Sequence, residues 1–392
     1  MGLFSEYLAL GDKLQPQLDD LRHAQLARIG MLRNSAVIVY AARIGQTPVN
    51  VNTGVSFDDI APFHDVLSGI SGDRVTVILE TLGGIGEVGK NMVEMLHDKF
   101  KHVSFVVPGT AKSTGTIMCL GGHEIMMGPA SSLGPIDAQI QQNGKQFSAD
   151  ALVEMIKEIQ AQIARTGALD PVYIPMLQNI SPGELQSAQN ALDFAKNTVA
   201  QWLCRYKFYD WQKSDEDKLV RAKEIASALA SQARWHTHGH SIRISDLRLL
   251  ELKIVDYSEN AELNDAILRY YVLLRLTFDS GPLYKIFETP TETIGQRFSV
   301  PAISPDSAAQ ALGQLRHASS AQIGMQCAKC KTQNTFQLDF VPGEPLQPGS
   351  RRFPDSGIAP CVSCNTALNV SGYRTEIEKK IGRPALAPQP SN

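Results

Sequence analysis

The sequence has little cysteine, little net charge and no long apolar run. Its 392 residues include six cysteines and carry a net charge of −3. That near balance argues against a protein that coats nucleic acid through bulk electrostatics, so we expect no nucleic-acid partner. No apolar run approaches the roughly 20 residues that a membrane-spanning helix needs, so we expect no transmembrane segment. The content of 43% hydrophobic and 20% charged residues excludes global disorder and indicates a packed core.

The N-terminal residues also lack a basic region followed by an apolar block, so we expect no signal peptide and a cytoplasmic location. In a reducing compartment, paired cysteines indicate metal ligands rather than disulfides. Two CxxC pairs account for four of the six cysteines: Cys327, Cys330, Cys361 and Cys364. Four thiolates on two turns are typical of a structural Zn²⁺ site, and they predict a zinc ribbon. Free buried thiols and an iron–sulfur site are the alternatives. The ribbon's role is left open between oligomer contact, substrate capture, a protein partner and nucleic-acid contact.

The chain is long enough for two or three structural units. Buried strands are predicted over 74–80 and 103–109, each followed by a turn and a helix, which indicates an α/β unit. Helical periodicity dominates 149–233 and returns over 260–288. The predicted organisation is a helical segment (1–34), an α/β domain with a helical extension (35–287), a Pro-, Ser-, Ala- and Gln-rich linker (288–322), the zinc-ribbon module (323–382) and a disordered tail (383–392).

Two strand-to-helix turns carry the residue types that acyl transfer requires. Gly83 and Gly84 follow the first buried strand, and Ser113 follows the second strand and begins a helix of small residues. A serine at such a turn can act as a nucleophile, and the backbone amides of Gly83, Gly84 and Thr114 can form an oxyanion hole. Parallel strands would bring both turns to one edge of the sheet. Taken singly, the glycines also suit a tight turn, and Ser113 suits a helix N-cap.

Three sequence blocks agree in order with one family: TLGG at 81–84, VPGTAKSTGT at 107–116 and EIMMGPASSLGPIDAQ at 124–139, with a weaker HGHSI at 238–242. They resemble the serine dehydrogenase proteinase family of the Clp protease/crotonase superfamily, related to signal peptide peptidase A. The resemblance implies a spiral of strand–turn–helix units, a serine endopeptidase with Ser113 as acyl nucleophile, a peptide or protein substrate and a homo-oligomer. Two departures stand out: Leu82 replaces the family's proline, and Lys112 replaces a small or apolar residue before the serine.

The general base that Ser113 needs is left open among three residues. His238 has suitable chemistry near neutral pH and matches the family's histidine–glycine pair. Lys157 lies 44 residues after the serine on an otherwise apolar helix, and the resemblance to signal peptide peptidase A implies a serine–lysine dyad. Asp137 can orient a base or act by itself. We rank His238 ahead of Lys157. The plainer alternatives are a solvated helix face for Lys157, a turn-forming role for Asp137 and a loop or metal-binding role for the alternating His236, His238 and His240.

Two other functions remain open at this stage. A crotonase-like acyl-CoA enzyme would use the glycine turns as an oxyanion hole for a thioester enolate, without the serine. A catalytically inert protease-like domain would act as an adaptor through its zinc ribbon.

Overall fold

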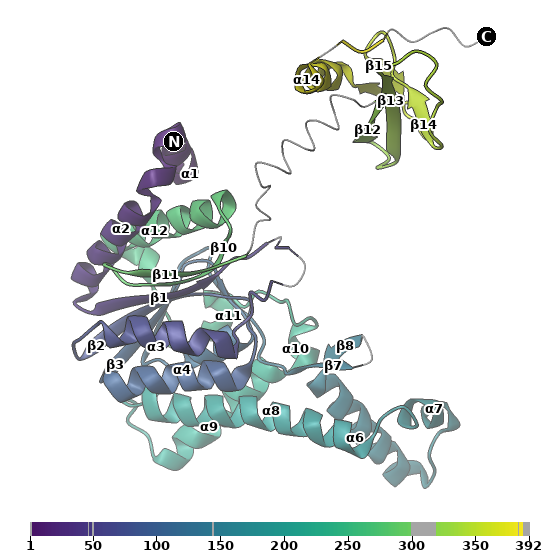
Figure 1. The fold of residues 1–392 in the computed structure, drawn as a ribbon. Coiled ribbons are helices and arrows are strands. Elements are labelled where there is room, and N and C mark those ends of the chain that lie inside the picture. Colours follow the sequence, from purple (N-terminus) through teal and green to yellow (C-terminus); the bar gives the residue numbers. More distant parts are fainter. Residues whose placement is uncertain are drawn as a thin grey trace. The chain divides into compact units, whose positions relative to one another are not determined.

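The computed structural model describes residues 2–45, 47–48, 51–142, 145–298, 319–382 and 384–386 (Figure 1). The chain divides into two compact units, Met1–Ser299 and Val300–Asn392. None of the helices in the described part of the chain has both the length and the apolar character that crossing a bilayer requires.

A seven-stranded sheet forms the centre of the first unit, in the order β11-β10-β1-β2-β3-β5-β9. Five strands are parallel, and β10 and β11 pair antiparallel at one edge. The parallel strands are buried on both faces, as their continuous apolar runs predict. The strands are β1 (Ala36–Ala42), β2 (Arg74–Glu80), β3 (His102–Val107), β5 (Glu124–Met127), β9 (Val255–Asp256), β10 (Leu283–Glu288) and β11 (Thr293–Arg297).

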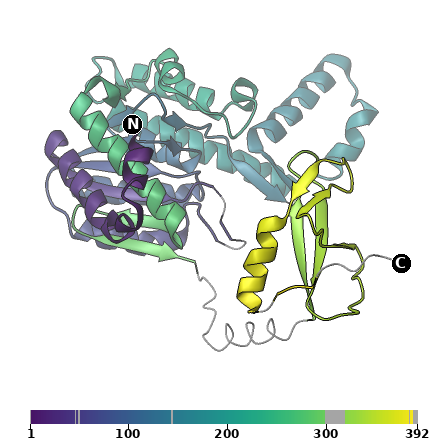
Figure 2. The ribbon, with the colours of Figure 1, turned by 90° about the horizontal axis from the view of Figure 1, so that it is seen from above.

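Helices cover both faces of this sheet (Figures 1 and 2). Alternate residues of each strand enter two separate cores, because successive side chains of a strand point to opposite faces. Ile38 and Tyr40 pack with α3 and α4, whereas Val37 and Val39 pack with α2 and α12. The helices of these layers and of the N-terminal segment are α1 (Leu3–Leu8), α2 (Leu18–Arg33), α3 (Ile60–Ser68), α4 (Gly86–Lys99), α5 (Thr114–Leu120) and α12 (Ala261–Ser280).

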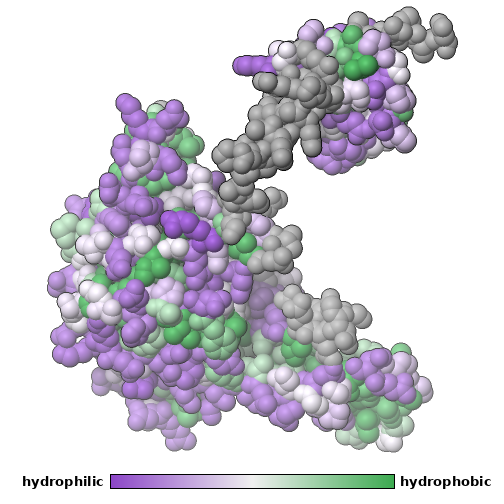
Figure 3. Space-filling view, in the orientation of Figure 1, coloured by the Kyte–Doolittle hydropathy of each residue, from purple (hydrophilic) through white to green (hydrophobic). Residues whose placement is uncertain are grey.

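The predicted helical extension is present, and serines cap four of its helices. The side chains of Ser148, Ser181, Ser214 and Ser231 each accept a bond from a first-turn amide. The helices are α6 (Ala149–Thr166), α7 (Ile174–Leu177), α8 (Pro182–Trp202), the π-helix η5 (Leu203–Lys207), α9 (Asp215–Ala230), α10 (Gln232–Trp235) and α11 (Ile244–Leu249). Helices α6 and α7 project from the sheet (Figure 1), and the far end exposes apolar side chains (Figure 3): Ile163, Val172, Ile174 and Met176.

Short strands complete the first unit near the serine turn. β4 (Thr110–Ala111) pairs with β6 (Ser132–Leu133), and β7 (Gln139–Gln142) pairs with β8 (Lys145–Ser148) ahead of α6. Leu133 also forms a bridge with Ile242, which brings the histidine-rich segment against β6.

The helix predicted over 260–288 is too long. Helix α12 ends at Ser280, where Gly281 and Pro282 follow, and LYKIFE forms strand β10 in the sheet. The sequence did not indicate this strand because it contains Lys285 and Glu288, and charged residues seldom lie in a buried strand unless they are paired. Lys285 forms an ion pair with Asp59, and Glu288 with Arg22. The predicted linker at 288–322 therefore begins too early, since it includes β11, and its residues 299–318 lie outside the described residues.

The second unit contains two small sheets and one helix. They are β12 (Ser320–Gln326), β13 (Gln333–Asp339) and β14 (Ser350–Arg352), then β15 (Ile358–Pro360) and β16 (Ala367–Asn369), and α14 (Ser371–Ile381). Its core is built on Phe336, Leu338 and Phe353. Part of the predicted disordered tail is packed: Ala385 is buried, and the amide of Leu386 donates to the carbonyl of Asp339. The rest of that prediction, at 383 and 387–392, lies outside the described residues.

Candidate active site

Ser113 lies on a strained turn between β4 and α5. Its φ of 51° and ψ of −115° are uncommon for any residue other than glycine. Backbone strain of this kind costs on the order of 1–3 kcal/mol and is concentrated at functional sites. A sharp strand-to-helix turn is also how hydrolases with a nucleophilic serine expose its hydroxyl group. The side chain of Ser113 is partly exposed, although the helix that follows it is fully buried.

Two glycines let the preceding turn approach Ser113. A Cβ at Gly83 would lie 2.7 Å from the Cβ of Ser113, and a Cβ at Gly84 would lie 2.3 Å from the amide nitrogen of Val55. Both glycines also have positive φ angles, so only glycine suits these positions. Val55 holds the turn from the other side: its amide donates to the Gly83 carbonyl at 2.8 Å, and its carbonyl accepts from the Ile85 amide at 2.9 Å.

The backbone amides of this turn differ in their hydrogen bonding. The Gly83 amide donates to the Oγ1 of Thr81 at 3.1 Å. Within the described residues, the amides of Gly84 and Thr114 have no acceptor. The Thr114 hydroxyl donates to the Gly84 carbonyl at 2.7 Å and so ties the two segments together. Two free amides therefore flank the serine turn, one from each segment.

Lys112 connects the serine turn to the histidine-rich loop. Its Nζ donates to the carbonyl of His240 at 2.7 Å, to the Ser241 hydroxyl at 2.9 Å and to the Leu133 carbonyl at 3.2 Å. Desolvation by burial lowers the pKa of Lys112 to about 8. The sequence showed Lys112 only as a departure from the family pattern. With the Gly239 carbonyl at 3.4 Å, it has four neutral oxygen partners, and they show that Lys112 ties the residues directly after His238 to the segment that precedes Ser113.

His238 and Asp137 form a close pair. The Nδ1 of His238 lies 2.7 Å from the Oδ1 of Asp137, whose side chain is 1% exposed. The other oxygen, Oδ2, accepts from the Nε2 of Gln139 at 2.7 Å. With an ionised carboxylate and a neutral imidazole, this contact would place the ring proton on Nδ1 and leave the Nε2 of His238 as an acceptor. Within the described residues, no hydrogen bond joins Ser113 to a base.

Lys157 lies in different surroundings. It is on α6, with a side chain that is 61% exposed, and its Nζ lies 2.7 Å from the Oε1 of Glu154. That hydrogen bond raises the pKa of Lys157. A lysine base needs a lowered pKa, which follows from desolvation. The structure therefore lacks the buried environment that the sequence suggested for Lys157.

The alternating histidines do not lie on a strand, because residues 236–239 form a bend and a turn. The His240 ring lies 5.2 Å from the Trp235 ring, and His236 has a positive φ at the end of α10. Within the part of the chain that the structure describes, the four paired cysteines form the one group of potential metal ligands.

Glu80 binds the segment that leads into β4 and the serine turn, and it was not identified from the sequence. It ends β2, is 1% exposed, and its Oε2 accepts from the amides of Gly109 and Thr110 at 3.1 and 2.9 Å. Desolvation by burial raises its pKa to about 7, although the Thr110 amide and Tyr271 favour the carboxylate. An acidic residue at the end of an apolar strand is the signal that could have identified it.

This carboxyl group should make stability depend on pH. Because the pKa of Glu80 is raised on folding, its contribution is fully present below about pH 4.5 and is lost as the pH rises through about 7. Only the wild type loses this contribution as the pH rises. We therefore expect the unfolding free energy of Glu80→Gln, minus that of the wild type, to increase by about 2 kcal/mol from pH 5 to pH 8. Denaturant unfolding at both pH values measures this difference. Glu87→Gln, on the exposed surface of α4, is the control, and equal behaviour of the two variants would contradict the assignment.

The four paired cysteines converge in the second unit. All four Sγ atoms lie within 4.8 Å of one another, and the cross-pair distances Cys327–Cys364 and Cys330–Cys361 are both 3.6 Å. The two turns are built alike. Lys331 and Asn365 each follow a second cysteine with a positive φ. Thr332 and Thr366 each place a hydroxyl 3.2–3.3 Å from a cysteine sulfur.

This geometry fits a tetrahedral metal ion. Four sulfurs about 2.3 Å from a central Zn²⁺ would lie about 3.8 Å from each other, close to the observed separations. Hydrogen bonds lower the pKa of Cys361 to about 6. The bond from the Ser363 amide has the largest effect, and the bond from the Asn334 side chain has the next largest. The cluster therefore has the donor set and the spacing of a closed, four-coordinate site.

Comparison with known proteins agrees with the motifs of the first unit. Residues 3–174 match the model of the ClpP-like SDH-type serine proteinase family. The uncharacterized protein MJ0137 of Methanocaldococcus jannaschii is 25% identical over 251 residues, which cover 62% of this chain and 77% of that protein. The membrane-bound protease PH1510 of Pyrococcus horikoshii is 25% identical over 158 residues, 38% of this chain and 35% of that protein. Among solved structures, a lysine-to-alanine mutant of the 1510-N membrane-bound stomatin-specific protease in complex with a substrate peptide is similar, with 23% identity and a TM-score of 0.23 over 39% of this chain and 68% of that chain.

The family prediction and the α/β fold that it implied are thus confirmed for the segment that carries the three motifs. The match ends at residue 174, so it does not extend to the second unit and its cysteines. Residues 3–174 of this chain are similar to the ClpP-like SDH-type serine proteinase family.

Proposed function

We propose that the protein is a serine endopeptidase that cleaves peptide or protein substrates, with Ser113 as nucleophile. The observation that carries this proposal is the strained turn of Ser113, packed against Gly83, together with a His238–Asp137 pair. Lys112, the residue before Ser113, holds the loop of His238 through hydrogen bonds to residues 240 and 241. A purely structural serine would need neither the positive φ nor the adjacent glycine.

The proposed reaction begins when the Nε2 of His238 takes the proton of the Ser113 hydroxyl as Oγ attacks the scissile carbonyl. Asp137 keeps the imidazole in the reactive tautomer and stabilises the imidazolium that forms. The amides of Gly84 and Thr114 donate to the oxyanion of the tetrahedral intermediate. His238 then returns the proton to the leaving amine, and the acyl-enzyme is hydrolysed by a water molecule that His238 deprotonates. Gly83 contributes by having no side chain, since its own amide is bonded to Thr81.

Labelling with a fluorophosphonate probe tests this proposal. The probe reacts with an activated serine hydroxyl, so we expect stoichiometric labelling of the wild type and none of Ser113→Ala. Ser68→Ala, which removes an exposed hydroxyl at the end of α3, should label like the wild type. Labelling that persists in Ser113→Ala would contradict the role of Ser113. An acyl-CoA activity that Ser113→Ala retains would instead support the crotonase-like alternative.

We propose further that the second unit binds one Zn²⁺ through Cys327, Cys330, Cys361 and Cys364. The converging sulfur atoms support this proposal. All four ligands would come from the protein, so the ion would have no open position for substrate, and its role would be structural.

A further inference from the structure

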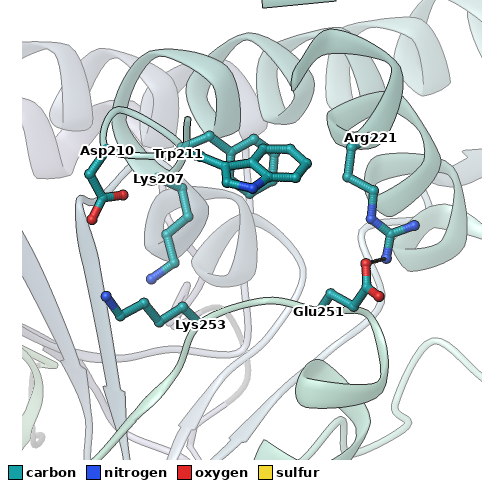
Figure 4. Close-up of a pocket in the computed structure, with 7 residues that line it drawn as sticks. Lys207, Asp210, Trp211, Arg221, Glu251 and Lys253 are labelled. Atoms are coloured by element: carbon teal, nitrogen blue, oxygen red, sulfur yellow. Dashed lines mark ion pairs between the residues drawn. The ribbon is translucent and has the colours of Figure 1, made fainter. Parts of the chain in front are cut away.

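A second pocket lies on the first unit, away from Ser113. It has a volume of about 550 Å³, which is within the usual range of small-ligand sites. Its lining residues are Lys207, Phe208, Asp210, Trp211, Arg221, Glu251 and Lys253 (Figure 4). An adjoining hollow of about 80 Å³ shares Lys207, Asp210 and Lys253 and reaches His102 and Glu124. His102 and Glu124 begin β3 and β5, so this pocket lies at the amino edge of the parallel strands, whereas Ser113 lies beyond the carboxyl edge.

Lys207 is the unusual residue of this pocket. It ends the π-helix η5 and is only 8% exposed. Within the described residues, its Nζ has no hydrogen bond and no ion pair, and this atom is not shielded from solvent, so it opens into the pocket. The stem of this lysine is buried while its ammonium group faces the pocket without a protein counter-ion, so an anion in the pocket could pair with it. Single π-helical turns are also frequent at functional sites.

The other charges of the pocket leave a positive excess beside Lys207. The amino groups of Lys207 and Lys253 converge, with the carboxylate of Asp210 beside them (Figure 4). Arg221 and Glu251 neutralise each other across the pocket, with their charged atoms 2.9 Å apart. Within the described residues, the carboxylate of Asp210 has no hydrogen-bond donor, so it is free to accept from a ligand.

An apolar wall completes the site. The rings of Phe208 and Trp211 form an edge-on pair with centroids 5.3 Å apart, and Trp211 is 37% exposed. An exposed aromatic face can stack on a planar group of a ligand. The pocket therefore combines two ammonium groups, one free acceptor and an aromatic surface within the dimensions of a small molecule.

We propose that this pocket binds a small phosphate-bearing molecule with a planar portion. The phosphate would lie between Lys207 and Lys253, because lysine is a common point-charge partner of phosphate. The planar portion would contact Trp211, and Asp210 would accept from a hydroxyl or amino group of the ligand. A mononucleotide has this chemistry, and inorganic phosphate has its anionic part alone.

Thermal unfolding of the full chain tests this proposal with three probes: AMP, inorganic phosphate and adenosine. A ligand that binds the folded state raises the midpoint temperature of unfolding. For a millimolar Kd and a ligand concentration ten times that Kd, the rise is about 2–4 °C. We expect AMP to raise the midpoint beyond potassium chloride of equal ionic strength, phosphate to raise it less, and adenosine to leave it unchanged. Titrations followed by tryptophan fluorescence give the Kd values, with Trp211→Phe identifying the signal of Trp211.

Two substitutions separate the site from other effects on the fold. Lys253→Met changes an exposed side chain, and Lys207→Met replaces a buried cation with an apolar chain of similar length. Each should raise the Kd for AMP at least tenfold, whereas Lys223→Met, on the exposed surface of α9, should not change it. A midpoint that neither AMP nor phosphate raises beyond chloride would overturn the proposal. So would unchanged AMP binding in both Lys207→Met and Lys253→Met. If phosphate raised the unfolding midpoint as much as AMP does, the proposed contact between Trp211 and the planar portion of the ligand would be wrong.

Discussion

Asp137→Asn is expected to lower kcat for peptide cleavage by about ten-thousand-fold without unfolding the protein. The reason is the 2.7 Å contact between Asp137 and the Nδ1 of His238. A carboxylate holds the proton on Nδ1, whereas an asparagine amide that donates to Nδ1 moves the proton to Nε2. The Nε2 of His238 could then no longer take the proton of Ser113. In a Ser-His-Asp triad, the same change lowers kcat by about this factor.

Steady-state kinetics with a peptide substrate measure this effect, with circular dichroism as the check on folding. The loss should fall on kcat more than on KM, because the substitution alters proton transfer rather than substrate contacts. His238→Ala should lose activity to a similar extent, and the double variant should lose little more than either single one, since the two residues act as a unit.

Lys157→Met distinguishes the two candidate bases. This side chain is 61% exposed and paired with Glu154, so its removal should leave kcat within about threefold of the wild type. A loss of activity in Lys157→Met comparable to that of Ser113→Ala, together with an active His238→Ala, would show that the base is the lysine. In that case α6 would have to move so that Lys157 becomes buried near Ser113.

Much of the fold could be predicted because the informative segments are locally consistent. RVTVILE reads as a buried strand, and β2 begins and ends at those residues. The serine-capped helices also formed as expected, because a cap and an amphipathic run are both local signals. β10 could not be predicted in this way. Its strand character depends on Asp59 and Arg22, which lie more than 200 residues away and neutralise Lys285 and Glu288.

The serine turn shows the same division between local and distant information. Ser113 and the two glycines could be identified because their residue types are required by the local backbone. Leu82 stands where the family has a proline, which would fix φ at that position. The structure shows another restraint on this turn: the backbone of Val55 forms one hydrogen bond with Gly83 and one with Ile85. The carbonyl of Gly54, next to Val55, accepts from the buried Lys285 at 2.7 Å. No local pattern around residue 82 contains that information.

The base was ambiguous in the sequence for a related reason. His238 lies 101 residues after Asp137, and only the tertiary structure brings them together. Lys112 ties both the Leu133 carbonyl and the His240 carbonyl to the serine turn, so it connects the two segments that carry this pair. Its position next to Ser113 concealed its role, since a lysine there most often extends into solvent.

Removal of the metal is expected to unfold the second unit and leave the first unit folded. The second unit has a small core, and its two CxxC turns are joined only by the sulfur contacts and by Asn334, whose side chain contacts the Cys361 sulfur and accepts from the Val362 amide, among the hydrogen bonds of the described residues. Without a metal ion, four thiols would be left crowded at the centre of the fold. Structural Zn²⁺ supplies apparent binding free energies on the order of 10–16 kcal/mol in small domains, which exceeds what a unit of this size gains from its core.

Metal analysis and hydrogen exchange together test this expectation. The purified chain should contain one Zn²⁺, and a chelator or Cys327→Ser should abolish protection of the β13 and β15 amides while β2 and β3 stay protected. Cys204→Ser, which changes a half-exposed thiol on the π-helix of the first unit, is the matched control and should keep both the metal and the protection. Protection that survives complete removal of the metal would show that the aromatic core around Phe336 and Phe353 is sufficient to fold the unit, and that the sulfur cluster has another use.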